Sequence, residues 1–198
     1  MKRFFRRKMK PTITIVSGLP RSGTSMTMKM LEAGGIPPLT DHIRSADDDN
    51  PKGYYEYERA KKLREGDTAW IPKAEGKVVK LIGALLVHMP SNYKYRVLFM
   101  RREMSEILAS QAKMLENRAE DNKVDDETMA ALFIKHVKQV EDWMDSQPNL
   151  QFITVDYNAI LKDPTPHIKK INQFLGGELD ESAMLGVIDP KLYRQRKE

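Results

Sequence analysis

The sequence predicts an α/β protein in which helices flank a central, mainly parallel sheet. Three observations support this class. A short apolar run, a glycine-bounded turn and a helical pattern follow one another near the N-terminus. Further along, short apolar runs alternate with longer segments of helical spacing, as in parallel sheets with crossover helices. The length of 198 residues is enough for one sizeable core.

The first half of the chain contains two of the expected strands. Residues 12–17 form an apolar, β-branched run that is typical of a buried strand. Residues 24–33 have a helical pattern that ends at a pair of glycines, which favour helix C-termini. Residues 36–53 contain three prolines and four aspartates, so we expect a long functional loop there. A helix is then expected at 54–64 and a strand at 77–82.

The second half alternates in the same way. Residues 95–101 and 150–155 are apolar enough to predict two more strands. Residues 103–117 have helical spacing, and 164–175 begin with a proline and end before two glycines, as helices often do. The clearest helix spans 126–146. Asp125 or Asp126 can cap its start. Its apolar stripe consists of Met129, Phe133, Val137, Val140 and Met144.

Charge is unevenly distributed along the chain. The net charge is +5, but residues 1–10 hold six basic residues and no acidic one. The remaining chain carries 27 basic and 28 acidic residues, a net charge of −1. We therefore expect a basic, solvated N-terminal tail at 1–10 and a single domain at 11–198 that does not bind nucleic acid.

Composition also excludes several chemistries. The absence of cysteine excludes disulfides, a thiolate nucleophile and a zinc–cysteine site. The four histidines are scattered without metal-ligand spacing, so no metal is expected. No apolar run is long enough to cross a membrane, and the N-terminus lacks the apolar stretch of a signal peptide. We expect a cytoplasmic protein with no integral membrane association.

The segment from Gly18 to Ser25 has the spacing of a phosphate-binding P-loop, G-x-x-x-x-G-K-S/T. Thr24 stands where the lysine should be, and the positive charge lies inside the loop at Arg21. Backbone N–H groups and the helix dipole favour an anion at such a place, and Arg21 adds a planar fork of donors. The loop therefore predicts a phosphate cradle in a P-loop NTPase-like three-layer fold, flanked by Thr24 and Ser25 hydroxyls.

The loop, Gly-Leu-Pro-Arg-Ser-Gly-Thr-Ser, resembles the 5′-phosphosulfate loop of sulfotransferases, which use 3′-phosphoadenosine 5′-phosphosulfate (PAPS). It is similar to the Pro-Arg-Ser-Gly-Thr form of tyrosylprotein and bacterial enzymes. The resemblance implies sulfuryl transfer to an acceptor hydroxyl or amine, with no metal, and with Arg21 stabilising the leaving phosphate. The implied donor-binding residues in the loop are Gly18, Arg21, Ser22, Gly23, Thr24 and Ser25.

Two other segments extend the resemblance. Arg102 follows an apolar strand and Ser110 comes eight residues later, the spacing of the family's 3′-phosphate site. An arginine at a strand end and a hydroxyl two turns into the next helix can converge on one phosphate. The segment Val155 to Pro164 is similar to another stretch of the family, which implies that Tyr157 lies near the adenine.

The catalytic base departs from the small-molecule enzymes of the family. Their Lys-Thr-His segment aligns with Lys80-Leu81-Ile82, so isoleucine replaces the histidine. Tyrosylprotein-type enzymes use a glutamate after the first helix, which implies Glu56 here. Asp41 and His42, in the same region, are the reserve candidates.

Two alternatives to a sulfotransferase remain at this point. A P-loop nucleotide kinase would require the loop lysine and an aspartate that binds magnesium, and both are missing from their expected places. A nucleotide-binding protein without catalysis is consistent with the missing histidine. The acceptor is expected to be a small molecule or a polymer, with residues 36–76 shaping its pocket.

Overall fold

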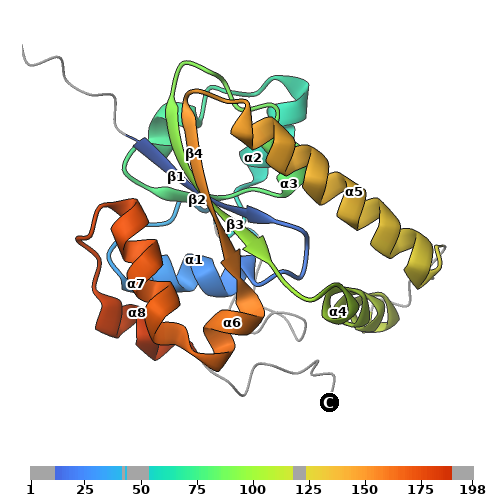
Figure 1. Cartoon of the computed structure of the whole chain (residues 1–198). Coiled ribbons are helices and arrows are strands. Elements are labelled where there is room, and N and C mark those ends of the chain that lie inside the picture. The colour runs from blue at the N-terminus through green and yellow to red at the C-terminus, as the bar shows by residue number, and fades with distance from the viewer. Residues whose placement is uncertain (1–11, 42, 44–53, 118–123, 189–198) are drawn as a thin grey trace, which may run out of the picture.

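The computed structural model describes residues 12–41, 43, 54–117 and 124–188 (Figure 1). Its sheet has four parallel strands in the order β2-β1-β3-β4. The strands are β1 (Thr12–Gly18), β2 (Val78–Lys80), β3 (Lys94–Arg101) and β4 (Leu150–Asp156). All four expected strands and the parallel sheet are confirmed. The predicted tail at 1–10 lies outside the described residues.

Helices connect the strands and cover both faces of the sheet. They are α1 (Thr24–Ala33), α2 (Glu58–Lys61), α3 (Gly83–Leu86), α4 (Met104–Asn117), α5 (Asp126–Asp145), α6 (Tyr157–Lys162), α7 (Pro164–Leu175) and α8 (Glu181–Val187), with short 3₁₀ turns at Lys62–Glu65 and Ile71–Ala74. The Asp125 side chain caps α5 by accepting the backbone N–H of Thr128, as predicted.

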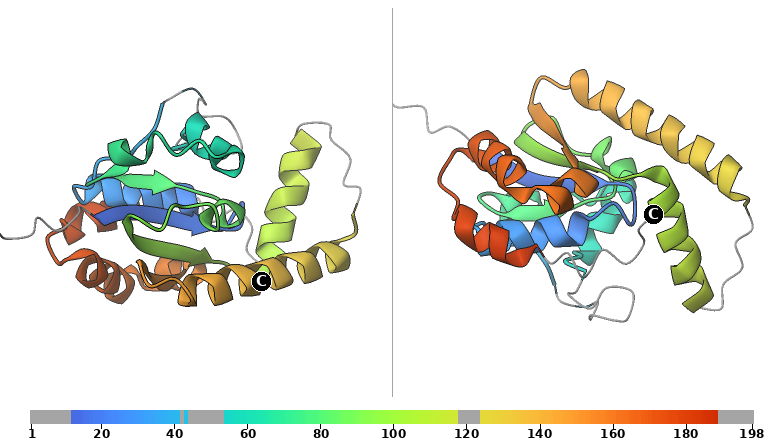
Figure 2. Two further views of the ribbon diagram at one scale, coloured as in Figure 1. Left: turned by 90° about the horizontal axis from the view of Figure 1, so that it is seen from above. Right: turned by 60° about the horizontal axis from the view of Figure 1, so that its bottom comes forward.

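The sheet lies between two apolar cores. Alternate residues of β1 face opposite sides, so Ile13 and Ile15 join one cluster and Val16 joins the other. The first cluster contains residues of α2, α3 and α5, and the second contains residues of α1, α6, α7 and α8. Figures 1 and 2 show these helices on opposite faces of the sheet, which makes three layers.

The helix expected at 54–64 is wrong in its first part. Tyr55 has a φ of 54° and Tyr57 is extended, so α2 begins only at Glu58. Glu56 therefore lies before the helix and not in its first turn. The short helices α3, α6 and α8 were not predicted, because segments of four to seven residues carry too little periodicity to be recognised.

The order of the strands determines where a ligand can bind. The chain moves from β1 to β2 on one side and then crosses to β3 on the other side of β1. In open parallel sheets, ligands bind outside the carboxyl ends of the strands at such a switch point. The loop after β1 and the turn after β3 meet there, and α4 and α5 extend beyond this edge (Figure 2).

Candidate active site

Two glycines allow the loop after β1 to pack closely against its surroundings. A Cβ on Gly18 would lie 2.7 Å from the carbonyl oxygen of Met100, and one on Gly23 would lie 2.2 Å from Cδ2 of Tyr157. Gly23 also has a φ of 95°, and Arg21, between them, has a φ of 68°. These left-handed backbone positions shape the turn that the sequence motif predicts.

Ser22 supports the loop from inside. It is fully buried, and its hydroxyl donates to the carbonyl oxygen of Leu19 at 2.7 Å. The backbone N–H of Ser22 donates to the same carbonyl oxygen at 3.3 Å, so both donors of Ser22 close the turn.

The first turn of α1 lies at the end of the loop. Its N-cap, Gly23, has no side chain to bond the N–H groups of this turn, which is the arrangement that favours anion binding. Thr24 is buried here. Ser25 Oγ accepts a hydrogen bond from Lys80 Nζ at 3.1 Å, and Lys80 also donates to the carbonyl oxygen of Tyr54 at 2.8 Å. The end of β2 thus brings a second cation to the loop.

The predicted 3′-phosphate residues lie next to the loop. Nε of Arg21 donates to Ser110 Oγ at 2.9 Å, and Nη1 of Arg102 donates to the carbonyl oxygen of Arg21 at 3.0 Å. Arg102 also pairs with Glu106 at 3.0 Å, with side chains only 9% and 5% exposed. Three donors from the loop, the β3 end and α4 therefore converge. Glu106 was not predicted, although its position four residues after Arg102 was a visible signal.

Tyr157 forms the wall behind these groups. Its ring packs against Gly23, and the Arg102 guanidinium carbon lies 4.8 Å from the ring centroid. Burial raises the pKa of Tyr157, and the positive charge of Arg102 offsets only part of this effect. The phenol therefore stays neutral at physiological pH. The structure therefore places Tyr157 beside the loop and Arg102.

The expected bases make local contacts. The Glu56 carboxylate pairs with Lys61 at 2.9 Å. The Asp41 carboxylate accepts the backbone N–H of Glu58 at 2.6 Å and that of Ile43 at 3.2 Å, which orders the start of α2. His42 lies outside the described residues.

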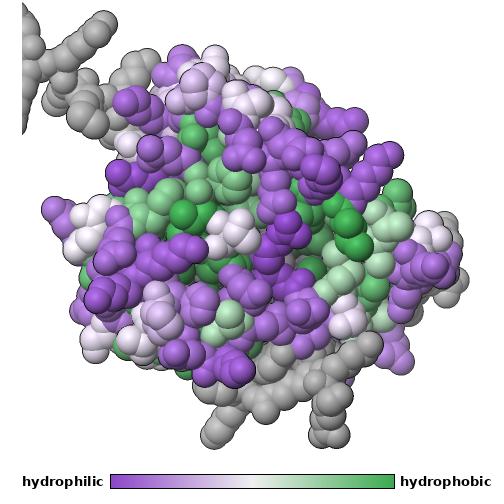
Figure 3. Space-filling view, viewed as in Figure 1, coloured by the Kyte–Doolittle hydropathy of each residue, from purple (hydrophilic) through white to green (hydrophobic). Residues whose placement is uncertain are grey.

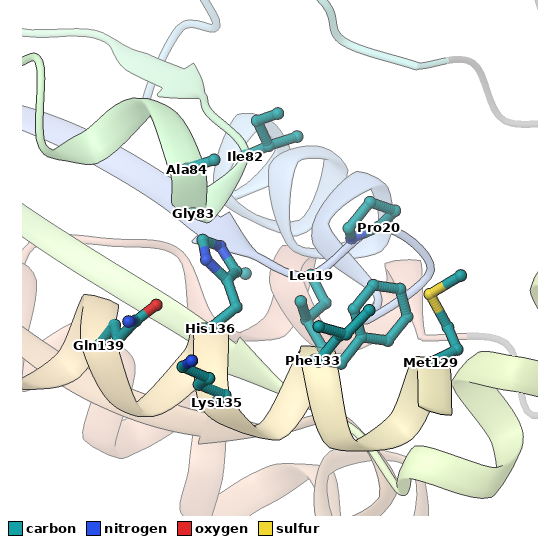
Figure 4. Close-up of a pocket in the computed structure, with 12 residues that line it drawn as sticks. Leu19, Pro20, Ile82, Gly83, Ala84, Met129, Phe133, Lys135, His136 and Gln139 are labelled. Atoms are coloured by element: carbon teal, nitrogen blue, oxygen red, sulfur yellow. The ribbon is translucent and has the colours of Figure 1, made fainter. Parts of the chain in front are cut away.

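A pocket of about 580 Å³ opens beside the loop (Figure 4). Its described walls come from the loop, from the segment that follows β2 and from α5, and not from the predicted region 36–76. The lining residues are Gly18, Leu19, Pro20, Ile82, Gly83, Ala84, Met129, Leu132, Phe133, Lys135, His136 and Gln139. The contribution of α5 was missed, because nothing in its sequence indicates which helix packs beside the loop.

The described part of the chain contains neither a metal-binding cluster nor a membrane-spanning helix. Within it, no group of three or more histidine, aspartate or glutamate side chains is arranged to hold a metal ion. None of its helices combines the length and the apolar character needed to cross a membrane.

The fold and the site match one family. The sulfotransferase domain model matches residues 11–191. The chain therefore belongs to the sulfotransferase domain family, and it is an enzyme of the sulfotransferase class. No curated protein matches the sequence. The kinase alternative is not favoured by the family match.

Solved structures agree on the fold. The sulfotransferase domain of the Synechococcus PCC 7002 olefin synthase has a TM-score of 0.57 at 16% identity, covering 99% of this chain and 88% of that one. The sulfotransferase domain of the curacin biosynthetic pathway has a TM-score of 0.53 at 15% identity, covering 91% and 79%. Retinol dehydratase in complex with retinol and PAP has a TM-score of 0.50 at 21% identity, covering 94% and 70%. These likenesses establish the P-loop NTPase-like α/β fold.

Proposed function

We propose that this sulfotransferase uses PAPS as its donor and transfers the sulfuryl group to a hydroxyl or amine of a small-molecule or polymer acceptor. The observation that carries the proposal is the convergence of Arg21, Arg102 and Ser110 at the carboxyl edge of the sheet. One cation in a loop suits any phosphate. A second cation and a hydroxyl beside it suit a ligand with two phosphate groups.

Each part of the donor then has a set of partners. The loop from Gly18 to Ser25 holds the 5′-phosphosulfate with its N–H groups, next to Lys80. Arg102 and Ser110 hold the 3′-phosphate, and Glu106 fixes the Arg102 guanidinium. Tyr157 lies near the adenine. Retinol dehydratase, which shares the fold, was solved with the corresponding bisphosphate, PAP.

The reaction is an in-line displacement at sulfur. The acceptor oxygen or nitrogen forms a bond to sulfur while the bond from sulfur to the phosphate oxygen breaks. Negative charge grows on the leaving phosphate, where Arg21 and the loop N–H groups stabilise it. The acceptor must also lose a proton. On the resemblance alone, Glu56 is the first candidate for that base.

Ligand-dependent thermal stabilisation tests the donor. We expect adenosine 3′,5′-bisphosphate to raise Tm much more than adenosine 5′-phosphate or ATP with magnesium, because only the bisphosphate engages both sites. Ser110→Ala should weaken bisphosphate binding about tenfold or more, since a hydrogen bond to a charged group is lost. The same variant should leave binding of adenosine 5′-phosphate nearly unchanged. Equal stabilisation by both adenylates would refute the proposed 3′-phosphate site.

A further inference from the structure

The pocket beside the loop contains one imidazole among apolar side chains. His136 projects from α5 toward Gly83 and the loop (Figure 4). Its Nε2 lies 3.4 Å from the point where a Cβ on Gly83 would stand, and the carbonyl oxygen of Gly18 lies 3.7 Å from the same point. The imidazole and the first residue of the phosphate loop therefore line the same pocket, on either side of Gly83.

His136 also differs chemically from the other groups that line the pocket. Among the described lining residues, Lys135 is the only other side chain that titrates, and it is a cation. Gln139 is an amide, and the groups from the loop and from residues 82–84 do not titrate. A neutral imidazole has a ring nitrogen that can accept a proton, which none of the amide, hydrocarbon or cationic groups of this lining can do.

The remaining walls indicate the kind of acceptor. Leu19, Pro20 and Phe133 are apolar, and two more apolar side chains, Ile82 and Leu132, are 47% and 53% exposed. A group of hydrophobic residues also shows on the surface over α5 (Figure 3). Covering exposed apolar surface is favourable, so the pocket suits an acceptor with an apolar body.

We infer that His136 is the catalytic base, in place of Glu56, and that the pocket holds an alcohol or phenol with an apolar body. The inference rests on the proposed function. The acceptor hydroxyl gives its proton to neutral Nε2 as its oxygen bonds to sulfur. The electron pair of the broken bond stays on the phosphate oxygen, and the products are a sulfate ester, the bisphosphate and protonated His136. A proton taken by Glu56 would instead break its ion pair with Lys61.

Replacement of the imidazole tests the base. His136→Gln keeps a side chain of similar size, and His88→Gln is the matched control at an exposed histidine. With PAPS and 4-butylphenol, we expect kcat/KM of His136→Gln to fall about 100-fold or more. The variant should also lose the acidic limb of the wild-type kcat/KM profile, because a protonated imidazole cannot accept the acceptor proton. His88→Gln should keep both properties.

A second pair of variants tests the pocket while His136 is left unchanged. Leu132 lines the pocket and Ile134 does not, although both are exposed residues of α5. Leu132→Ser should raise KM for 4-butylphenol about 5-fold or more, since apolar contact is lost, and Ile134→Ser should not. Neither change should alter KM for PAPS.

Binding of adenosine 3′,5′-bisphosphate distinguishes failure of the proposed donor from failure of the proposed base. If the wild-type enzyme does not bind it, the donor assignment fails, and this inference fails with it. If bisphosphate binds but His136→Gln keeps its turnover and acidic limb, only the base is overturned. Loss of turnover in Glu56→Gln but not in His136→Gln would likewise overturn His136 as the base. Sulfuryl transfer to glucosamine but not to 4-butylphenol would overturn the apolar acceptor. Failure to transfer the group to either compound would overturn it as well.

Discussion

Substituting Gly23 tests how the loop depends on Tyr157. An alanine at Gly23 must adopt a φ of 95°, which costs about 1–2 kcal/mol for a residue with a Cβ. Its Cβ would also lie 2.2 Å from Cδ2 of Tyr157, a ring that is only 7% exposed and cannot easily move. Overpacking of this kind costs about another 1–3 kcal/mol. We therefore expect Gly23→Ala to lower the free energy of unfolding by about 2–5 kcal/mol.

Gly35 provides a matched control for this prediction. Its φ is 105°, but nothing lies within 4 Å of the Cβ that an alanine would add. Gly35→Ala should therefore show only the backbone cost, about 1–2 kcal/mol in urea denaturation. Gly23→Ala should also bind adenosine 3′,5′-bisphosphate more weakly, because a displaced Tyr157 ring leaves Arg102. Equal stability losses in the two variants, with unchanged bisphosphate binding, would refute the steric reasoning.

Two other predictions concern charges and pH. Glu106→Ala should cost about 3–5 kcal/mol, because it leaves the Arg102 guanidinium buried without its carboxylate. The exposed pair Lys138–Asp142 has the same i,i+4 spacing, and Asp142→Ala should cost less than about 0.5 kcal/mol, as chemical denaturation of both variants will show. Burial raises the pKa of Tyr95. The stability this provides is fully present below about pH 10 and is lost as pH rises further, by up to about 1.4 kcal/mol per pH unit. Tyr95→Phe should make that decline shallower, and an identical slope would contradict the assignment.

The sequence was sufficient for the parts of the fold that have long or regular patterns. The apolar run of β1, the stripe of α5 and the proline and glycines around α7 each specify an element by local chemistry. The short helices lack such patterns. The helix expected from residue 54 failed because Tyr55 adopts a left-handed conformation, which no local signal in an aromatic stretch indicates.

The residues of the candidate site also divide into those that sequence spacing can predict and those that depend on tertiary packing. Arg102 and Ser110 could be singled out by their spacing after one strand and in one helix, and each of them contacts Arg21. Ser22 was expected to face the ligand, but its hydroxyl bonds inside the turn. The position of His136 depends on how α5 packs across the sheet, which is a tertiary contact and leaves no mark in the spacing of the residues.

The bond between Arg21 and Ser110 joins residues that are 89 positions apart in the chain. Gly23 and Tyr157, whose ring packs against it, are separated by even more residues along the chain. During translation, the loop leaves the ribosome before its partners, because Arg102 follows β3, Ser110 lies in α4 and Tyr157 follows β4. At about 5–20 residues per second, this interval is on the order of ten seconds. A nascent chain therefore carries the loop without its partners during this time, and the proposed donor can stabilise the protein only after Tyr157 has been made.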